Sequence, residues 1–266
     1  MSNTVLLTNE IARWLCIRLA RVVGAMAVLC SAASMTALAQ AQAKPPDLTG
    51  VWAVYRGARG GDPKLAPTEA GPLALKPGYA KPYEARRAAE AEANKRGEQL
   101  ANGSALCIPY GVPTMMSVAI YPVEIIQTPR QVTIISEAFS EVRRVYLDRP
   151  QEKFEDVPPG YYGRSVGRWE GDTLVVDTVG IKTSVPGYRG MPHSEQMRIT
   201  ERLRLVAPDY LHDQVTIEDP VVLDKPVVYT LAYRRMPGYE MVEFVCDNNR
   251  EFVDEKGVVR MRLKDH

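Results

Sequence analysis

The stretch that decides the fold runs from Ser165 to Val206. It reads SVGRWEGDTLVVDTVG (165–180), IKTSVPGYRGMPHSEQ (181–196) and MRITERLRLV (197–206). In the last segment apolar and polar residues alternate, which is the period of a half-buried strand. A carboxylic acid on the buried face of a strand is costly unless it has a partner or a function. The predicted buried face carries one such acid and is formed by Met197, Ile199, Glu201, Leu203 and Leu205.

Segments on both sides of this stretch are also typical of strands. They are rich in Val, Ile, Thr and Tyr and are separated by Gly, Pro, Asn or Asp. Glu170-Gly171-Asp172 and Pro129-Arg130 suit tight hairpin turns. Short antiparallel strands at this spacing predict a mainly β protein, either a closed barrel or a β-sandwich. The predicted strands also include residues 117–129, 131–142, 143–148, 212–219, 226–235 and 239–247.

One helix is expected outside the strands. Residues 83–100 are rich in Ala, Glu, Lys and Arg, which favour helix. The segment has no continuous apolar stripe, so we expect it to lie on the surface with its charges in solvent. No helix alternates with the strands, which disfavours a doubly wound sheet.

The first 39 residues are interpreted as a secretory signal peptide and not as part of the fold. Three arginines precede the apolar run VVGAMAVLC, and Ala37-Leu38-Ala39 fits the cleavage pattern. The apolar run is too short for a stable membrane span. We therefore expect a periplasmic or secreted protein with a flexible tether at 40–47 and one barrel-like domain at 48–266.

Charge and cysteine usage agree with export. Removing residues 1–39 takes away three Arg and one Glu and changes the net charge from +1 to about −1. A chain that is nearly neutral has no excess of positive charge with which to bind nucleic acid. Only Cys107 and Cys246 remain. In an oxidising compartment they can form one disulfide, which by the chain-entropy model would add roughly 4–5 kcal/mol. The alternative is two buried thiols that do not meet.

Several blocks resemble known proteins. LTGVW (48–52), followed by a meander of strands, resembles the lipocalin-like (calycin) barrels. Further blocks resemble a set of exported bacterial proteins that is mostly uncharacterised. The resemblance therefore implies a fold and a location much more than a function. These further blocks are CIPYGVP (107–113), EIIQTPRQVTIISE (124–137), SVGRWEGDTLVVDTVG (165–180), PHSEQ (192–196), ERLRLV (201–206) and TIEDP (216–220).

No motif for a metal or a nucleotide is present. The three histidines are widely spaced, and the sequence has no C-x-x-C, EF-hand loop, Walker loop or G-x-S-x-G. We therefore expect no cofactor, no metal site and no serine-hydrolase nucleophile. The remaining option for chemistry is acid/base catalysis in a cavity.

Glu201 and His193 are the candidate catalytic pair. Burial on an apolar face would raise the pKa of Glu201 toward the range useful for proton transfer. His193, eight residues earlier in a Gly/Pro-rich loop, could exchange a proton near neutral pH. The structural alternatives are a Glu201 that pairs with a buried arginine and a His193 that is an ordinary loop residue.

Four residues are candidates for substrate binding. Tyr229 and Tyr233 share one face of a predicted strand and could line a pocket or simply pack in the core. Arg168 could clamp a carboxylate or form a surface ion pair. Tyr110 lies in CIPYGVP, where two prolines would stiffen a loop at a pocket rim.

Two functions follow from these residues. The first is a cofactor-independent lyase or isomerase that acts on a small, mostly apolar, aromatic-type substrate by proton transfer. The second is a non-catalytic carrier of a small hydrophobic or aromatic molecule, which needs the cavity and the tyrosines but no acid/base pair.

Overall fold

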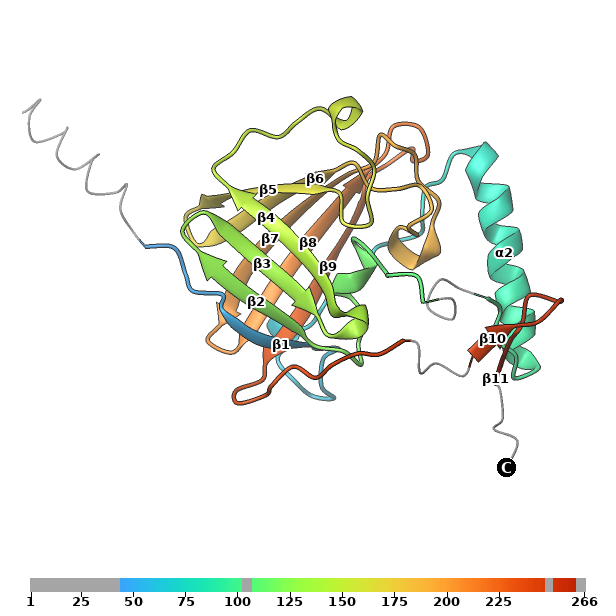
Figure 1. Cartoon of the computed structure of the whole chain (residues 1–266), viewed down its shortest axis with the longest axis horizontal. Coiled ribbons are helices and arrows are strands. Elements are labelled where there is room, and N and C mark those ends of the chain that lie inside the picture. The colour runs from blue at the N-terminus through green and yellow to red at the C-terminus, as the bar shows by residue number, and fades with distance from the viewer. Residues whose placement is uncertain (1–43, 102–106, 247–250, 262–266) are drawn as a thin grey trace, which may run out of the picture. The chain divides into compact units, whose positions relative to one another are not determined.

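The computed structural model describes residues 44–101, 107–246 and 251–261. Nine strands close into a barrel in chain order, β1 to β9, with β9 pairing back to β1 (Figure 1). The expected mainly β barrel is thus confirmed. The strands are β1 (Gly50–Val54), β2 (Val123–Thr128), β3 (Gln131–Ser136), β4 (Glu141–Leu147), β5 (Arg164–Glu170), β6 (Thr173–Val179), β7 (Arg198–Ala207), β8 (Tyr210–Glu218) and β9 (Val227–Arg235).

All neighbouring strand pairs in the barrel are antiparallel except β4 and β5. β4 ends at Leu147 and β5 begins at Arg164. The connection between them is long enough to return the chain to the other end of the barrel, so the two strands run in the same direction. The barrel is therefore mixed, whereas the sequence predicted antiparallel strands alone.

The predicted hairpin turns are confirmed. β2 and β3 are joined by Pro129-Arg130, and β5 and β6 by Gly171-Asp172. Gly171 has φ +63°, and a Cβ added there would meet no atom within 4 Å. Positive φ is the backbone conformation that favours glycine in a two-residue hairpin.

Apolar side chains that point inward fill the barrel. Those on β7 alternate as the sequence predicts, with Ile199 and Leu203 buried on either side of Glu201. The largest apolar side chains of this core are Leu48, Trp52, Met115, Met116, Ile125, Ile134, Leu174, Ile181, Met191, Met197 and Tyr233.

Helix α2 (Pro77–Lys95) is the predicted surface helix, shifted toward the N-terminus. It begins with Pro77 at its first helical position, which proline tolerates, and also contains Pro82. The sequence predicted a loop up to Pro82, because residues 57–82 are rich in Gly and Pro and show no clear periodicity. Within the helix only Ala93 is buried, and Tyr83 ties it to the loop after β6 by donating a hydrogen bond to the Arg189 carbonyl at 3.2 Å.

The C-terminal part of the chain differs from the prediction. Residues 239–246 form no strand, because their backbone groups do not join a ladder. A separate hairpin follows, made of β10 (Glu251–Val253) and β11 (Val259–Met261). Short helical turns lie at Pro63–Leu65, Thr114–Met116, Ala138–Ser140, Phe154–Asp156 and Tyr188–Gly190.

Cys107 and Cys246 form the predicted disulfide, with their Cα atoms 5.8 Å apart. Structural disulfides are typical of proteins in oxidising compartments. The proposed signal peptide and the first half of the tether, residues 40–43, lie outside the described residues. In the part of the chain that is described, no helix has the length and apolar character needed to cross a membrane.

Candidate functional site

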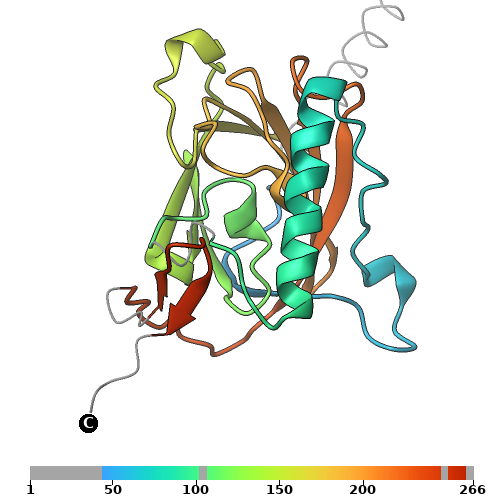
Figure 2. The same cartoon turned by 90° about the vertical axis from the view of Figure 1, so that its right-hand side faces the viewer.

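One end of the barrel is filled by the segment 108–117, which we call the plug. Figure 2 shows its helical turn, Thr114–Met116, lying across this end. Met115 and Met116 are buried in the barrel core, and the Tyr233 hydroxyl donates a 2.6 Å hydrogen bond to the Met116 carbonyl. The plug therefore closes the interior below it.

Glu141, at the start of β4, holds the first part of the plug. Its two carboxylate oxygens accept hydrogen bonds from the backbone N–H groups of Tyr110 (2.7 Å) and Gly111 (2.8 Å). Burial raises the pKa of Glu141, although both of these bonds favour its ionised form. Burial also raises the pKa of the neighbouring Tyr162 to about 12, with a smaller contribution from the charge of Glu141.

Gly111 lets the plug approach its neighbours closely. Its φ is +65°, and an added Cβ would lie 2.5 Å from the carbonyl oxygen of Tyr161. The next residue, Val112, donates a 2.9 Å hydrogen bond to that same carbonyl. A side chain at position 111 would therefore push the plug away from the wall that fixes it.

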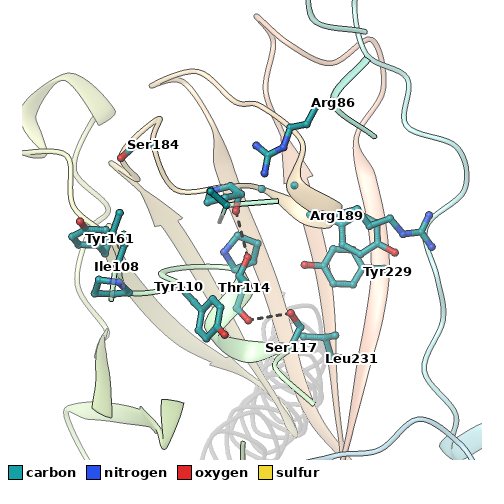
Figure 3. Close-up of a pocket in the computed structure, with 17 residues that line it drawn as sticks. Arg86, Ile108, Tyr110, Thr114, Ser117, Tyr161, Ser184, Arg189, Tyr229 and Leu231 are labelled. Atoms are coloured by element: carbon teal, nitrogen blue, oxygen red, sulfur yellow. Dashed lines mark hydrogen bonds between the residues drawn. The ribbon is translucent and has the colours of Figure 1, made fainter. Parts of the chain in front are cut away.

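Above the plug lies a cavity of about 700 Å³, which we call the mouth pocket (Figure 3). Its walls come from the plug, the loop 184–190, α2 and the inner face of β9. Its volume lies in the range of small-molecule sites. It is lined by Arg86, Ala101, Ile108, Pro109, Tyr110, Pro113, Thr114, Ser117, Tyr161, Ser184, Pro186, Gly187, Tyr188, Arg189, Gly190, Tyr229 and Leu231.

An aromatic pair forms one wall of the mouth pocket. Tyr188 stacks on Tyr229 with ring centroids 4.2 Å apart and ring planes 24° apart. The Tyr188 hydroxyl donates a 2.7 Å hydrogen bond to Glu69, which also accepts one from Arg189 at 2.6 Å. The hydrogen bond from Tyr188, and after it that from Arg189, lowers the pKa of Glu69. The Tyr188 ring is therefore held in place from outside the pocket.

Polar groups of the plug also meet the loop 184–190. Thr114 donates a 3.4 Å hydrogen bond to the Pro186 carbonyl, and Ser117 donates one of 3.0 Å to the Thr114 carbonyl.

Burial raises the pKa of the Tyr229 hydroxyl well above its usual value. Tyr229 therefore faces the pocket as a neutral phenol.

The predicted site residues fall into two groups. Tyr110 and Tyr229 line the mouth pocket, and their role in binding stays a prediction. Tyr233 lies on the same face of β9 but is fully buried and bonded to the plug. Arg168 lies on the outer face of β5, where it pairs with Glu170 at 2.5 Å and does not line the pocket.

Glu201 lies inside the barrel, where a buried arginine is its partner. Arg143 of β4 donates from Nη1 to Glu201 Oε1 at 2.8 Å and from Nη2 to Oε2. Both side chains are 1% exposed. Arg143 also donates to the Ser165 and Thr178 hydroxyls, at 3.1 and 2.9 Å. Glu201 thus has the structural partner that the sequence analysis kept as the alternative to catalysis.

His193 is separate from Glu201. Its ring nitrogens lie 2.7 Å from the Val185 carbonyl and 2.9 Å from the Ser194 carbonyl. It is 6% exposed and fixes the loop before β7. The structure therefore gives the two predicted catalytic side chains different partners, and neither of them lines the mouth pocket.

Asp213 is a buried acid that the sequence analysis missed. It lies on the inner face of β8 and is 0% exposed. Burial, and after it the charge of Glu201, raises the pKa of Asp213 well above its usual range. Its strand partner is Leu231, which lines the mouth pocket. The alternation Leu211, Asp213, Val215 was the available signal.

The fold and the pocket define a class: a closed nine-stranded barrel with a plugged end and a ligand-sized cavity beside the plug. No protein-family model matches the chain, and no curated protein shows significant similarity to it. Among the described residues, no cluster of three or more His, Cys, Asp or Glu side chains could hold a metal ion.

Proposed function

We propose that this protein is an exported carrier that binds a small, mostly apolar molecule with an aromatic part in the mouth pocket. The observation that carries the proposal is the cavity of about 700 Å³ beside a stacked Tyr188–Tyr229 pair. Pockets of this size with aromatic walls and few polar groups are typical small-molecule sites. Export is supported by the Cys107–Cys246 disulfide, the signal-like N-terminus and the resemblance to exported barrels.

The rigidity of the walls supports binding to a preformed site. The plug is held by Glu141, by Tyr233 and by the Val112–Tyr161 backbone hydrogen bond. The opposite wall is held by Glu69 through Tyr188. A preformed pocket does not have to be ordered when the ligand enters, so more of the contact energy contributes to affinity.

The test uses residues 40–266 and the neutral fluorescent probe N-phenyl-1-naphthylamine. We expect saturable binding that Leu231→Arg weakens at least tenfold, because the new side chain enters the pocket. The matched control is Val228→Arg on the outer face of the same strand, where the native side chain is 46% exposed. Equal probe binding by the two arginine variants would contradict the proposal.

An acid/base enzyme of the lyase or isomerase type is a second candidate, and Asp213 is the observation that favours it. A buried carboxyl whose pKa is raised well above its usual range, as that of Asp213 is, can act as a general acid. Asp213 is the strand partner of Leu231, which lines the mouth pocket. Glu201, in contrast, accepts hydrogen bonds from Arg143, and both ring nitrogens of His193 lie within hydrogen-bond distance of carbonyl oxygens.

A bound ligand distinguishes the carrier from the enzyme. Nuclear magnetic resonance in D2O shows whether the protein exchanges carbon-bound protons of the ligand or converts it. Turnover that Asp213→Asn abolishes and His193→Gln leaves intact supports an enzyme built on Asp213. Recovery of an unchanged, unlabelled ligand supports the carrier.

A further inference from the structure

The charges around the mouth pocket have one sign. Two of its lining residues are arginines, Arg86 of α2 and Arg189 of the loop, and no lining residue is Asp or Glu. Figure 3 shows Arg86 extending over the pocket, whereas the Arg189 guanidinium points away from it. Arg86 is therefore the cation that a bound molecule would meet.

Arg86 is only partly neutralised by its neighbours. Its Nε donates to Glu90 Oε1 at 2.9 Å, and Arg87 Nη1 donates to the other oxygen, Oε2, at 2.7 Å. Two guanidinium groups thus share one carboxylate, which leaves a local excess of one positive charge. The Nη1 and Nη2 groups of Arg86 are not used in its bond to Glu90. A planar pair of N–H donors of this kind suits a carboxylate.

The position of Arg86 complements the apolar wall. A molecule whose ring packs against Tyr229 and Leu231 would have its other end at the rim, where α2 passes. A charged group at that end would stay partly hydrated and would meet Arg86 without being fully buried. An uncharged polar group there would gain less, because hydrogen bonds between ionised groups are roughly twice as strong as neutral ones.

We propose that the ligand of the mouth pocket is an amphipathic organic anion, an aromatic or apolar body with a carboxylate that Arg86 binds at the rim. This inference rests on the proposed function, because it names the class of ligand for the same pocket. It requires that removal of the Arg86 charge weakens binding of the acid and spares its uncharged analogue.

The experiment compares 2-naphthoate with 2-naphthamide, which have nearly the same shape and differ in charge. Calorimetry on residues 40–266 should show about tenfold tighter binding of the acid. Arg86→Gln should remove most of this preference, and higher ionic strength should reduce it. Lys95→Gln is the matched control, because Lys95 also pairs with a glutamate of α2, Glu92, but does not contact Glu90 or line the mouth pocket, so the preference should persist.

The outcomes separate this inference from the proposed function. Equal affinity for the acid and the amide, with N-phenyl-1-naphthylamine still bound, overturns the anion inference alone. An acid preference that Lys95→Gln lowers as much as Arg86→Gln also overturns it, because the effect would then come from the general charge of the helix. Failure of all three compounds to bind overturns both proposals.

Discussion

At the scale of single residues, Arg143, Glu201 and Asp213 lie close together inside the barrel, and their charges balance only if one acid keeps its proton. Arg143 and Glu201 form a buried ion pair, and Asp213 lies close enough for the charge of Glu201 to act on it. Leaving Asp213 protonated makes the group neutral overall. A neutral cluster costs less to bury than one with a net charge.

Asp213→Asn should change how stability depends on pH. The folded protein keeps the Asp213 proton above the unfolded pKa of 3.8, so unfolding releases it, and rising pH favours unfolding. This contribution is fully present below pH 3.8 and is lost as pH rises to the folded pKa, by about 1.4 kcal/mol per pH unit. Urea unfolding of the Asn variant should lack this slope.

The control for that experiment is Asp172→Asn, at a side chain that is 62% exposed. Its urea unfolding curves between pH 4 and 8 should follow those of the native protein. Identical slopes for native protein and Asp213→Asn would mean that Asp213 is ionised in the folded state.

Glu201→Gln should cost about 3–5 kcal/mol of unfolding free energy, because it removes the carboxylate to which the buried Arg143 donates two hydrogen bonds. Glu170 offers a matched control, since it also accepts hydrogen bonds from two arginines but is 38% exposed. Glu170→Gln should cost much less, because water and salt screen an exposed ion pair. Thermal and urea unfolding of the two variants check this difference, and equal losses would contradict it.

The sequence could predict that Glu201 is buried but not which residue pairs with it. Alternation along β7 places Glu201 on the core face by local geometry alone. Arg143 is 58 residues away, and their contact depends on how four strands curve around the barrel. The Cys107–Cys246 pair was predictable for a different reason, because an exported chain with two cysteines has only one disulfide available.

At the scale of elements, local chemistry decided which predictions succeeded. The turns at Pro129-Arg130 and Gly171-Asp172 were predictable because a two-residue hairpin depends on its own residues. The parallel pairing of β4 with β5 was not, because the connection between them has no regular pattern. The mouth pocket was missed except for Tyr110 and Tyr229, since its walls come from six separate segments.

Gly111→Ala should destabilise the protein more than the replacement of a positive-φ glycine in open space, because the added methyl group collides with the wall behind the plug. Gly171→Ala isolates the backbone cost at positive φ, about 1–2 kcal/mol, because an added Cβ there meets no atom. Gly111→Ala adds a contact of 2.5 Å with the Tyr161 carbonyl oxygen. We expect Gly111→Ala to lower the unfolding free energy more than Gly171→Ala does. Only Gly111→Ala should also weaken the binding of N-phenyl-1-naphthylamine. Equal effects of the two substitutions would show that the plug can shift at no cost.

At the scale of the whole molecule, the Cys107–Cys246 disulfide joins the start of the plug to the segment that follows β9. The two cysteines are 139 residues apart, and strands β2 to β9 lie between them. A cross-link over so long a loop removes much of the freedom of the unfolded chain.

Replacing both cysteines by serine should lower the unfolding free energy by up to about 5 kcal/mol in the chain-entropy model. Guanidinium unfolding of the variant, compared with native protein with and without reductant, measures the loss. The reduced native protein should match the variant. An unchanged midpoint would show that the cross-link constrains only the segment after β9 and not the barrel.

The most recognisable block of the chain, SVGRWEGDTLVVDTVG, builds β5 and β6 and contributes no residue to the mouth pocket within the described structure. The part of the sequence that builds this side of the barrel is therefore not the part that lines the proposed ligand site. If the carrier proposal holds, proteins that share this block can share a scaffold and still bind different molecules. A search for proteins with the same cargo should compare the plug, the loop 184–190 and the position of Arg86, and should give the long block little weight.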